Sequence, residues 1–166
     1  MYDVDKLRTP QECRTVMQRA RDRNLPEVYN AAFRRLCTLI GNANEDPSDP
    51  LVADFYKTLA AYEQLLTEKN NRNTAASRTR QKIANKGVHQ SLIEWTRGKV
   101  ETNGFKLLVD AGLPEYTGEY LVVLYSDRFP KDVVALARNR LAAHGIAMPV
   151  TDQGPMVMSA LGSVSV

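Results

Sequence analysis

Apolar residues recur every three or four positions through the first 70 residues, which is the spacing of amphipathic α-helices. Three helices are predicted there, at residues 10–24, 26–41 and 50–70. The first has the signature of a capping box, because Thr9 precedes Pro10 and Glu12 follows three positions after Thr9. The third has the clearest apolar face, and its members are expected to lie in the core: Leu51, Phe55, Leu59, Tyr62 and Leu66.

A glycine divides the next stretch into two helical segments. Residues 74–85 suit a helix, and Gly87 is expected to end it in a left-handed conformation. Val88, Leu92 and Trp95 then form a second short apolar face. Residues 80–96 therefore read as helix, turn and helix, an arrangement that resembles the helix-turn-helix unit of DNA-binding proteins.

The remaining pattern is also helical, with helices predicted at residues 105–112, 119–125 and 131–144. The run EYLVVLY at 119–125 contains residues typical of strands, but its helical context and the Thr117 cap favour a helix. We therefore expect a mainly α fold of about six to seven helices, forming one domain at residues 1–145. Residues 146–166 contain no basic residue and are predicted to be a flexible tail.

Charge is distributed unevenly along the chain. Residues 69–106 contain nine basic and two acidic side chains, a net charge of +7, whereas residues 1–68 and 107–166 each carry −2. The net charge of +3 thus comes from one central segment. A concentrated positive charge favours a polyanionic partner, and nucleic acid is the simplest candidate.

The basic segment supplies the predicted binding residues. Arg78, Lys82 and Lys86 recur every four positions and are expected to face phosphates together. Gln90, Ser91 or Arg97 would reach base edges if the helix-turn-helix interpretation holds, and that interpretation is the reason to favour duplex DNA over RNA. The nine candidate nucleic-acid-binding residues are Arg72, Arg78, Arg80, Lys82, Lys86, His89, Gln90, Arg97 and Lys99. By contrast, Arg34 and Arg35 are interpreted as a solvated helix flank.

No catalytic residue, metal ligand or cofactor is predicted, so the chain is not expected to be an enzyme. Cys13 and Cys37 are the only cysteines, are expected to be reduced, and form no Cys-x-x-Cys pair. The sequence contains no Asp/Glu-x-Lys metal-nuclease tripeptide and no phosphate-cradling Gly-x-x-x-x-Gly-Lys motif. Glu115 and Glu119, four residues apart, are interpreted as solvated surface charges.

Two alternative functions remain open. In one, the chain is a protein-interaction or adaptor module, whose basic segment meets an acidic partner surface and whose apolar tail (Met156 to Leu161) docks on that partner or on a second copy in a homo-oligomer. In the other, it is a nuclease or a nuclease subunit. No apolar run approaches the length of a membrane span, and no secretory signal is recognised, so we expect a cytoplasmic DNA-binding protein, such as a transcriptional regulator.

Overall fold

The structure is a computed structural model that describes residues 2–43 and 48–149, and all regular secondary structure in this part of the chain is helical. Seven α-helices and three short 3-10 helices follow one another within this part, without a strand. The predicted mainly α fold is confirmed. The predicted tail falls almost entirely on residues 150–166, outside the described residues.

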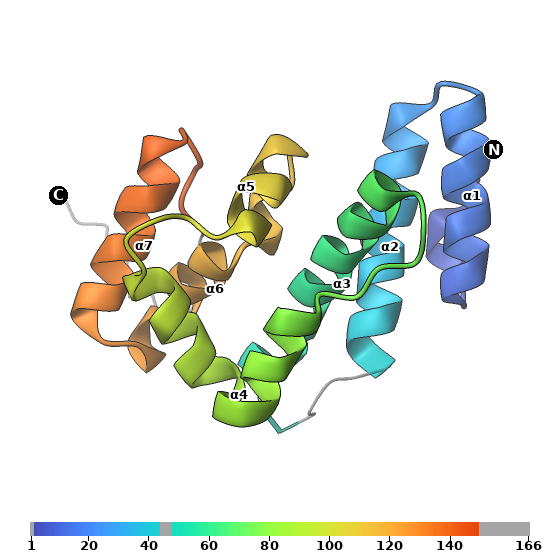
Figure 1. Cartoon of the computed structure of the whole chain (residues 1–166). Helices are drawn as coiled ribbons and strands as arrows, with labels where there is room; N and C mark the ends of the chain where they lie inside the picture. Colours follow the sequence, from blue (N-terminus) through green and yellow to red (C-terminus); the bar gives the residue numbers. More distant parts are fainter. Residues whose placement is uncertain (1, 44–47, 150–166) are drawn as a thin grey trace, which may run out of the picture. The chain divides into compact units, whose positions relative to one another are not determined.

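The chain divides into two compact units, residues 1–84 and 85–166, which we call unit 1 and unit 2. The predicted single domain at residues 1–145 remains a prediction. Unit 1 contains a 3-10 helix, three complete α-helices and the first segment of α4 (Figure 1). Their bounds are η1 Val4–Lys6, α1 Pro10–Asp22, α2 Pro26–Ala43, α3 Pro50–Asn70 and α4 Ser77–Arg97.

In unit 1, α2 packs against both α1 and α3 (Figure 1). The predicted capping box begins α1, because Thr9 Oγ1 accepts a hydrogen bond from Glu12 N and Glu12 Oε2 accepts one from Thr9 N, both at 3.2 Å. The core is formed mainly by Cys13, Met17, Phe33, Leu36, Cys37, Leu51, Phe55 and Leu59. Of the predicted stripe on α3, Tyr62 and Leu66 are half-buried rather than buried.

Gly41 differs from its predicted role. The sequence suggested that it ends the second helix, but α2 continues to Ala43 and Gly41 is buried inside it. A Cβ atom at this position would lie 2.4 Å from Lys57 Cγ and 3.0 Å from Lys57 N. Glycine is therefore present because the backbones of α2 and α3 approach closely here.

Unit 2 contains the second segment of α4, three complete α-helices and two 3-10 helices (Figure 1). Their bounds are α5 Asn103–Asp110, η2 Pro114–Tyr116, α6 Gly118–Leu124, η3 Ser126–Arg128 and α7 Lys131–Ala143. The ambiguous run at 119–125 is helical as predicted, and Thr117 Oγ1 caps α6 by accepting a hydrogen bond from Tyr120 N at 3.2 Å. The buried core includes Val88, Leu92, Phe105, Leu121, Val122, Val133, Ala137 and Leu141.

Candidate nucleic-acid interface

The connection between α3 and α4 is fixed by hydrogen bonds within unit 1. Asn71 ends α3 in a left-handed conformation, with φ 56°. Thr74 then anchors the connection to α3, because its backbone N–H donates to Thr67 Oγ1 at 3.0 Å. The Thr74 hydroxyl donates to Arg72 O at 2.8 Å and accepts from Asn70 Nδ2 at 3.3 Å. These bonds give the exposed residues 69–73 a defined backbone path.

Glu63 on α3 fixes the start of α4. One of its carboxylate oxygens accepts from Ala76 N at 2.8 Å, and the Arg80 guanidinium donates to both oxygens at 2.7 Å. This fork-to-fork geometry is the strongest form of an arginine–carboxylate pair, although its partial exposure to water weakens it. The carboxylate raises the pKa of Arg80. Arg80, one of the nine predicted binding residues, therefore has a partner on α3.

Two of the other candidate cations of unit 1 are more available than Arg80. Arg72 and Arg78 are exposed, and neither makes an ion pair with any residue that the structure describes. Lys82 is half-buried. The hydrogen bonds of Thr74 and Glu63 thus hold the backbone on both sides of Arg72 and Arg78 while leaving these two side chains accessible.

The second segment of α4 begins after a break in the helix. Gly87 has φ 82° and ψ 167°, so the predicted interruption at this glycine is present. The helix-turn-helix arrangement itself stays a prediction, because the two segments belong to different units. Beyond the break, Glu94 accepts hydrogen bonds from Lys86 Nζ at 2.9 Å and from Gln90 Nε2 at 3.0 Å. Lys86 and Gln90, two further candidates, therefore share one carboxylate in unit 2.

His89 and Arg97 also have partners within unit 2. His89 Nε2 lies 2.6 Å from the carbonyl oxygen of Arg128; a carbonyl can only accept, so this nitrogen carries the hydrogen. The ring stacks on Phe129, with centroids 4.8 Å apart. Arg97 donates to both carboxylate oxygens of Asp132, at 3.0 and 3.1 Å, and this contact lowers the pKa of Asp132.

The buried face of the second segment of α4 differs slightly from the apolar face that the sequence predicts. Ser91 and Thr96 are buried and Trp95 is half-buried, whereas the sequence put Trp95 on the apolar face and Ser91 among the three residues that would reach base edges. Ser91 Oγ is enclosed and has no hydrogen-bond partner among the residues that the structure describes, so this hydroxyl does not reach solvent. Lys99 lies in the connection to α5, is exposed, and makes no ion pair with a described residue.

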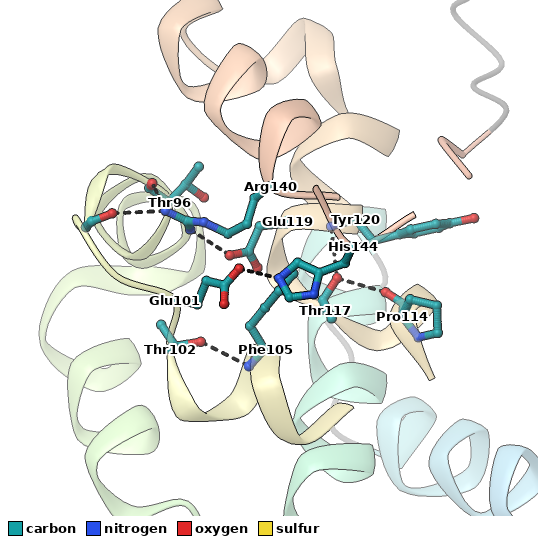
Figure 2. Close-up of polar contacts among 11 residues, drawn as sticks. Thr96, Glu101, Thr102, Phe105, Pro114, Thr117, Glu119, Tyr120, Arg140 and His144 are labelled. Carbon is teal, nitrogen blue, oxygen red and sulfur yellow. Dashed lines mark hydrogen bonds and ion pairs between the residues drawn. The ribbon is translucent and has the colours of Figure 1, made fainter. Parts of the chain in front are cut away.

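Sequence reasoning missed a buried ion pair in unit 2, shown in Figure 2. Glu119 Oε2 accepts from Arg140 Nη1 at 2.8 Å, and the two side chains are only 6% and 11% exposed. Glu119 is therefore not the solvated surface charge that the sequence suggested. Burial raises the pKa of Glu119, and the hydrogen bond and charge of Arg140 offset part of that rise. The sequence does contain one signal of this pair, because Glu119 is a lone acid within the apolar run EYLVVLY.

Arg140 also closes the end of α4. Its Nη2 donates to Thr96 O at 3.2 Å and to Gly98 O at 3.0 Å, carbonyl groups that the helix end leaves unpaired (Figure 2). Close by, His144 Nε2 meets Glu101 Oε2 at 2.5 Å, and the His144 ring packs edge-on against Phe105. These contacts position the loop that carries Lys99. They hold the fold of unit 2 together.

Other kinds of site are not visible in the described residues. No group of three or more His, Cys, Asp or Glu side chains is placed there to hold a metal ion. None of the described helices is long and apolar enough to cross a membrane. Cys13 and Cys37 are free thiols, and both are buried.

Comparison of the chain with models of known protein families, with curated proteins and with solved structures gave no match.

Proposed function

We propose that this chain binds nucleic acid through the phosphate backbone, with duplex DNA as the expected ligand, and that it does so without catalysis. The contact surface lies along residues 69–82 of unit 1. Unit 1 contains 14 basic and 11 acidic residues, a net charge of +3, whereas unit 2 contains eight of each. The net positive charge of the chain thus belongs to the unit that carries Arg72 and Arg78.

The availability of Arg72 and Arg78 is the observation that carries the proposal. Both are exposed and lack an ion-pair partner among the described residues, and the backbone on either side of them is fixed by Thr74 and Glu63. A pre-organised backbone lowers the entropic cost of binding, since only the side chains remain to be ordered. Planar guanidinium groups match the geometry of phosphate oxygens.

The proposed contact is with phosphates more than with bases. Gln90 and Arg97, the candidates for base contacts, already have carboxylate partners in unit 2, and Ser91 is buried. Phosphate contacts position a protein on nucleic acid but carry no sequence information. Little preference among DNA sequences is therefore expected.

A binding titration tests this function. Fluorescence anisotropy with labelled duplex DNA, single-stranded DNA and duplex RNA should show binding to the DNA duplex that weakens steeply with added salt. Failure to bind any of the three at low salt would overturn the proposal and favour an acidic protein partner. Degradation of the probe on addition of Mg²⁺ would contradict the absence of catalysis.

A further inference from the structure

The turn that joins α3 to α4 (Figure 1) carries three consecutive exposed residues, Asn71, Arg72 and Asn73. We propose that Asn71 and Asn73 bind the nucleic-acid backbone beside Arg72, as uncharged hydrogen-bond donors to phosphate oxygens. The inference rests on the proposed function, because it adds contacts to the same surface. It goes beyond that function by assigning part of the affinity to groups that carry no charge.

Thr67 on α3 holds the backbone of this turn. Its carbonyl oxygen accepts hydrogen bonds from Asn71 N and, at 3.2 Å, from Arg72 N. Its Oγ1 accepts from Thr74 N at 3.0 Å, and the Thr74 hydroxyl donates to Arg72 O at 2.8 Å. Residues 71–73 therefore keep one backbone path although their side chains are exposed.

The donor groups of the two asparagines are unoccupied. Neither side-chain amide has a hydrogen-bond partner among the described residues, and the backbone N–H of Asn73 lacks one there as well. The amide of Asn70 is different, because it donates to Thr74 Oγ1 at 3.3 Å and so belongs to the turn itself. The turn thus presents two amides and one backbone N–H next to Arg72.

Asn71 lies at a position where glycine is the usual residue. Its φ of 56° places the end of α3 in the left-handed region, which glycine adopts without steric cost. Asparagine is also tolerated there, and it adds an amide that glycine does not have. Because this amide makes no bond to the described residues, hydrogen bonding within the turn does not account for it.

Uncharged donors complement an arginine at a phosphate. Phosphate oxygens accept hydrogen bonds from asparagine side chains and backbone N–H groups as well as from arginine. The Cα atoms of Asn71 and Asn73 are at most about 7.6 Å apart, which is twice the spacing of consecutive Cα atoms. A nucleic-acid backbone that Arg72 holds at this turn therefore passes close to both amides.

Arg34 and Arg35, adjacent cations on α2, are less accessible than the turn. Both are half-buried, so the expectation that they form a solvated flank is wrong. Arg35 Nε and Nη2 donate to the carbonyl oxygen of Leu7 at 3.0 and 2.9 Å. The guanidinium of Arg35 is thus engaged within unit 1, whereas residues 71–73 are exposed.

The double variant Asn71→Gly/Asn73→Ala tests the inference. Glycine keeps the left-handed backbone at position 71, so the turn should keep its shape. Affinity for duplex DNA should fall by roughly 5- to 100-fold at every salt concentration, the effect of two net hydrogen bonds. The slope of log affinity against log salt should stay that of the wild type, because uncharged donors release no counterions.

The matched control is Asn24→Gly/Asn30→Ala. Both residues are exposed in unit 1, and Asn24 has a positive φ of 54°, as Asn71 does. The control should bind duplex DNA with the wild-type affinity and slope.

Substitutions of Asn73 alone provide a second comparison. Asn73→Gln keeps an amide and should retain most of the affinity, whereas Asn73→Asp replaces the donor by a carboxylate that repels phosphate. Asn73→Asp should therefore bind more weakly than Asn30→Asp, which makes the same charge change elsewhere in unit 1.

Three outcomes would contradict the inference. If the wild type binds DNA and Asn71→Gly/Asn73→Ala binds equally tightly, the two amides make no contact. A flatter slope in the double variant also refutes the inference, because the asparagines would then act by holding Arg72 in place and not by contacting phosphate. If no form of the chain binds DNA, the proposed function fails as well.

Discussion

Lys86 and Glu94 form an ion pair across the non-helical Gly87, with Lys86 Nζ 2.9 and 3.1 Å from the two carboxylate oxygens. Eight residues of continuous α-helix rise by about 12 Å, so the backbone break favours a contact at this separation. The pair is partly exposed and contributes little stability by itself. The pair is informative because its geometry is consistent with a bend of the helix at Gly87.

Gly87→Ala should therefore destabilise the protein. The φ of 82° with ψ of 167° belongs to a region that glycine alone adopts readily, and the cost to alanine is about 1–3 kcal/mol. Apart from the adjacent backbone, no atom of the described residues lies within 4 Å of the added Cβ, so the effect comes from backbone strain and not from a clash. Urea unfolding measures it. Stabilisation by up to about 1 kcal/mol, the usual result of Gly→Ala inside a helix, would show instead that α4 is continuous.

Arg140→Met should be among the most damaging single changes in unit 2. It leaves the Glu119 carboxylate buried without its partner and removes the donor to Thr96 O and Gly98 O. Breaking a buried pair in this way costs about 3–5 kcal/mol. The double variant Glu119→Leu/Arg140→Met should recover much of the loss. A double variant as unstable as the single one would show that the pair is not what makes Arg140 important.

The buried carboxyl also predicts a pH dependence. Because the pKa of Glu119 is raised in the folded state from its ordinary value of 4.5, the folded protein binds more protons than the unfolded chain just above that pH. The contribution of Glu119 to the free energy of unfolding should therefore fall as the pH rises above 4.5. The free energy of unfolding of the wild type relative to Glu119→Gln, measured from pH 4 to pH 7, should decrease. An increase over that range would mean that Arg140 lowers the pKa below its ordinary value.

The two thiols should react only after unfolding. Burial raises the pKa of Cys37 to about 12 and also raises that of Cys13, so both are thiols rather than thiolates at neutral pH. Thiolates are the reactive form. A colorimetric thiol reagent at pH 8 should modify neither cysteine of the native chain quickly, and both in denaturant. Fast reaction of one equivalent in the native protein would place that cysteine at the surface.

Local signals predicted most of the fold. Caps at Thr9 and Thr117, together with apolar spacing, placed the helices, because both features act within a few residues. The role of Gly41 could not be predicted, since the reason for glycine is the backbone of Lys57 on another helix.

The candidate site was predicted less well for the same reason. Counting basic residues along the sequence identifies the basic segment at residues 69–106. It does not identify the acidic side chains that pair with these basic residues in the folded chain. Glu63 pairs with Arg80 and Asp132 pairs with Arg97, from 17 and 35 residues away. These contacts separate the cations that hold the fold from those, such as Arg72 and Arg78, that are open to a ligand.

The most direct test of the account is the salt dependence of duplex DNA binding by Arg72→Ala/Arg78→Ala. Its matched control is Arg8→Ala/Arg19→Ala, which removes two exposed arginines from the same unit. If Arg72 and Arg78 each contact a phosphate, their replacement should flatten the slope of log affinity against log salt by about two units and weaken binding to all sequences alike. The control should keep the wild-type slope. A slope that survives in Arg72→Ala/Arg78→Ala but is lost in the control would contradict the account and place the interface on another face of unit 1.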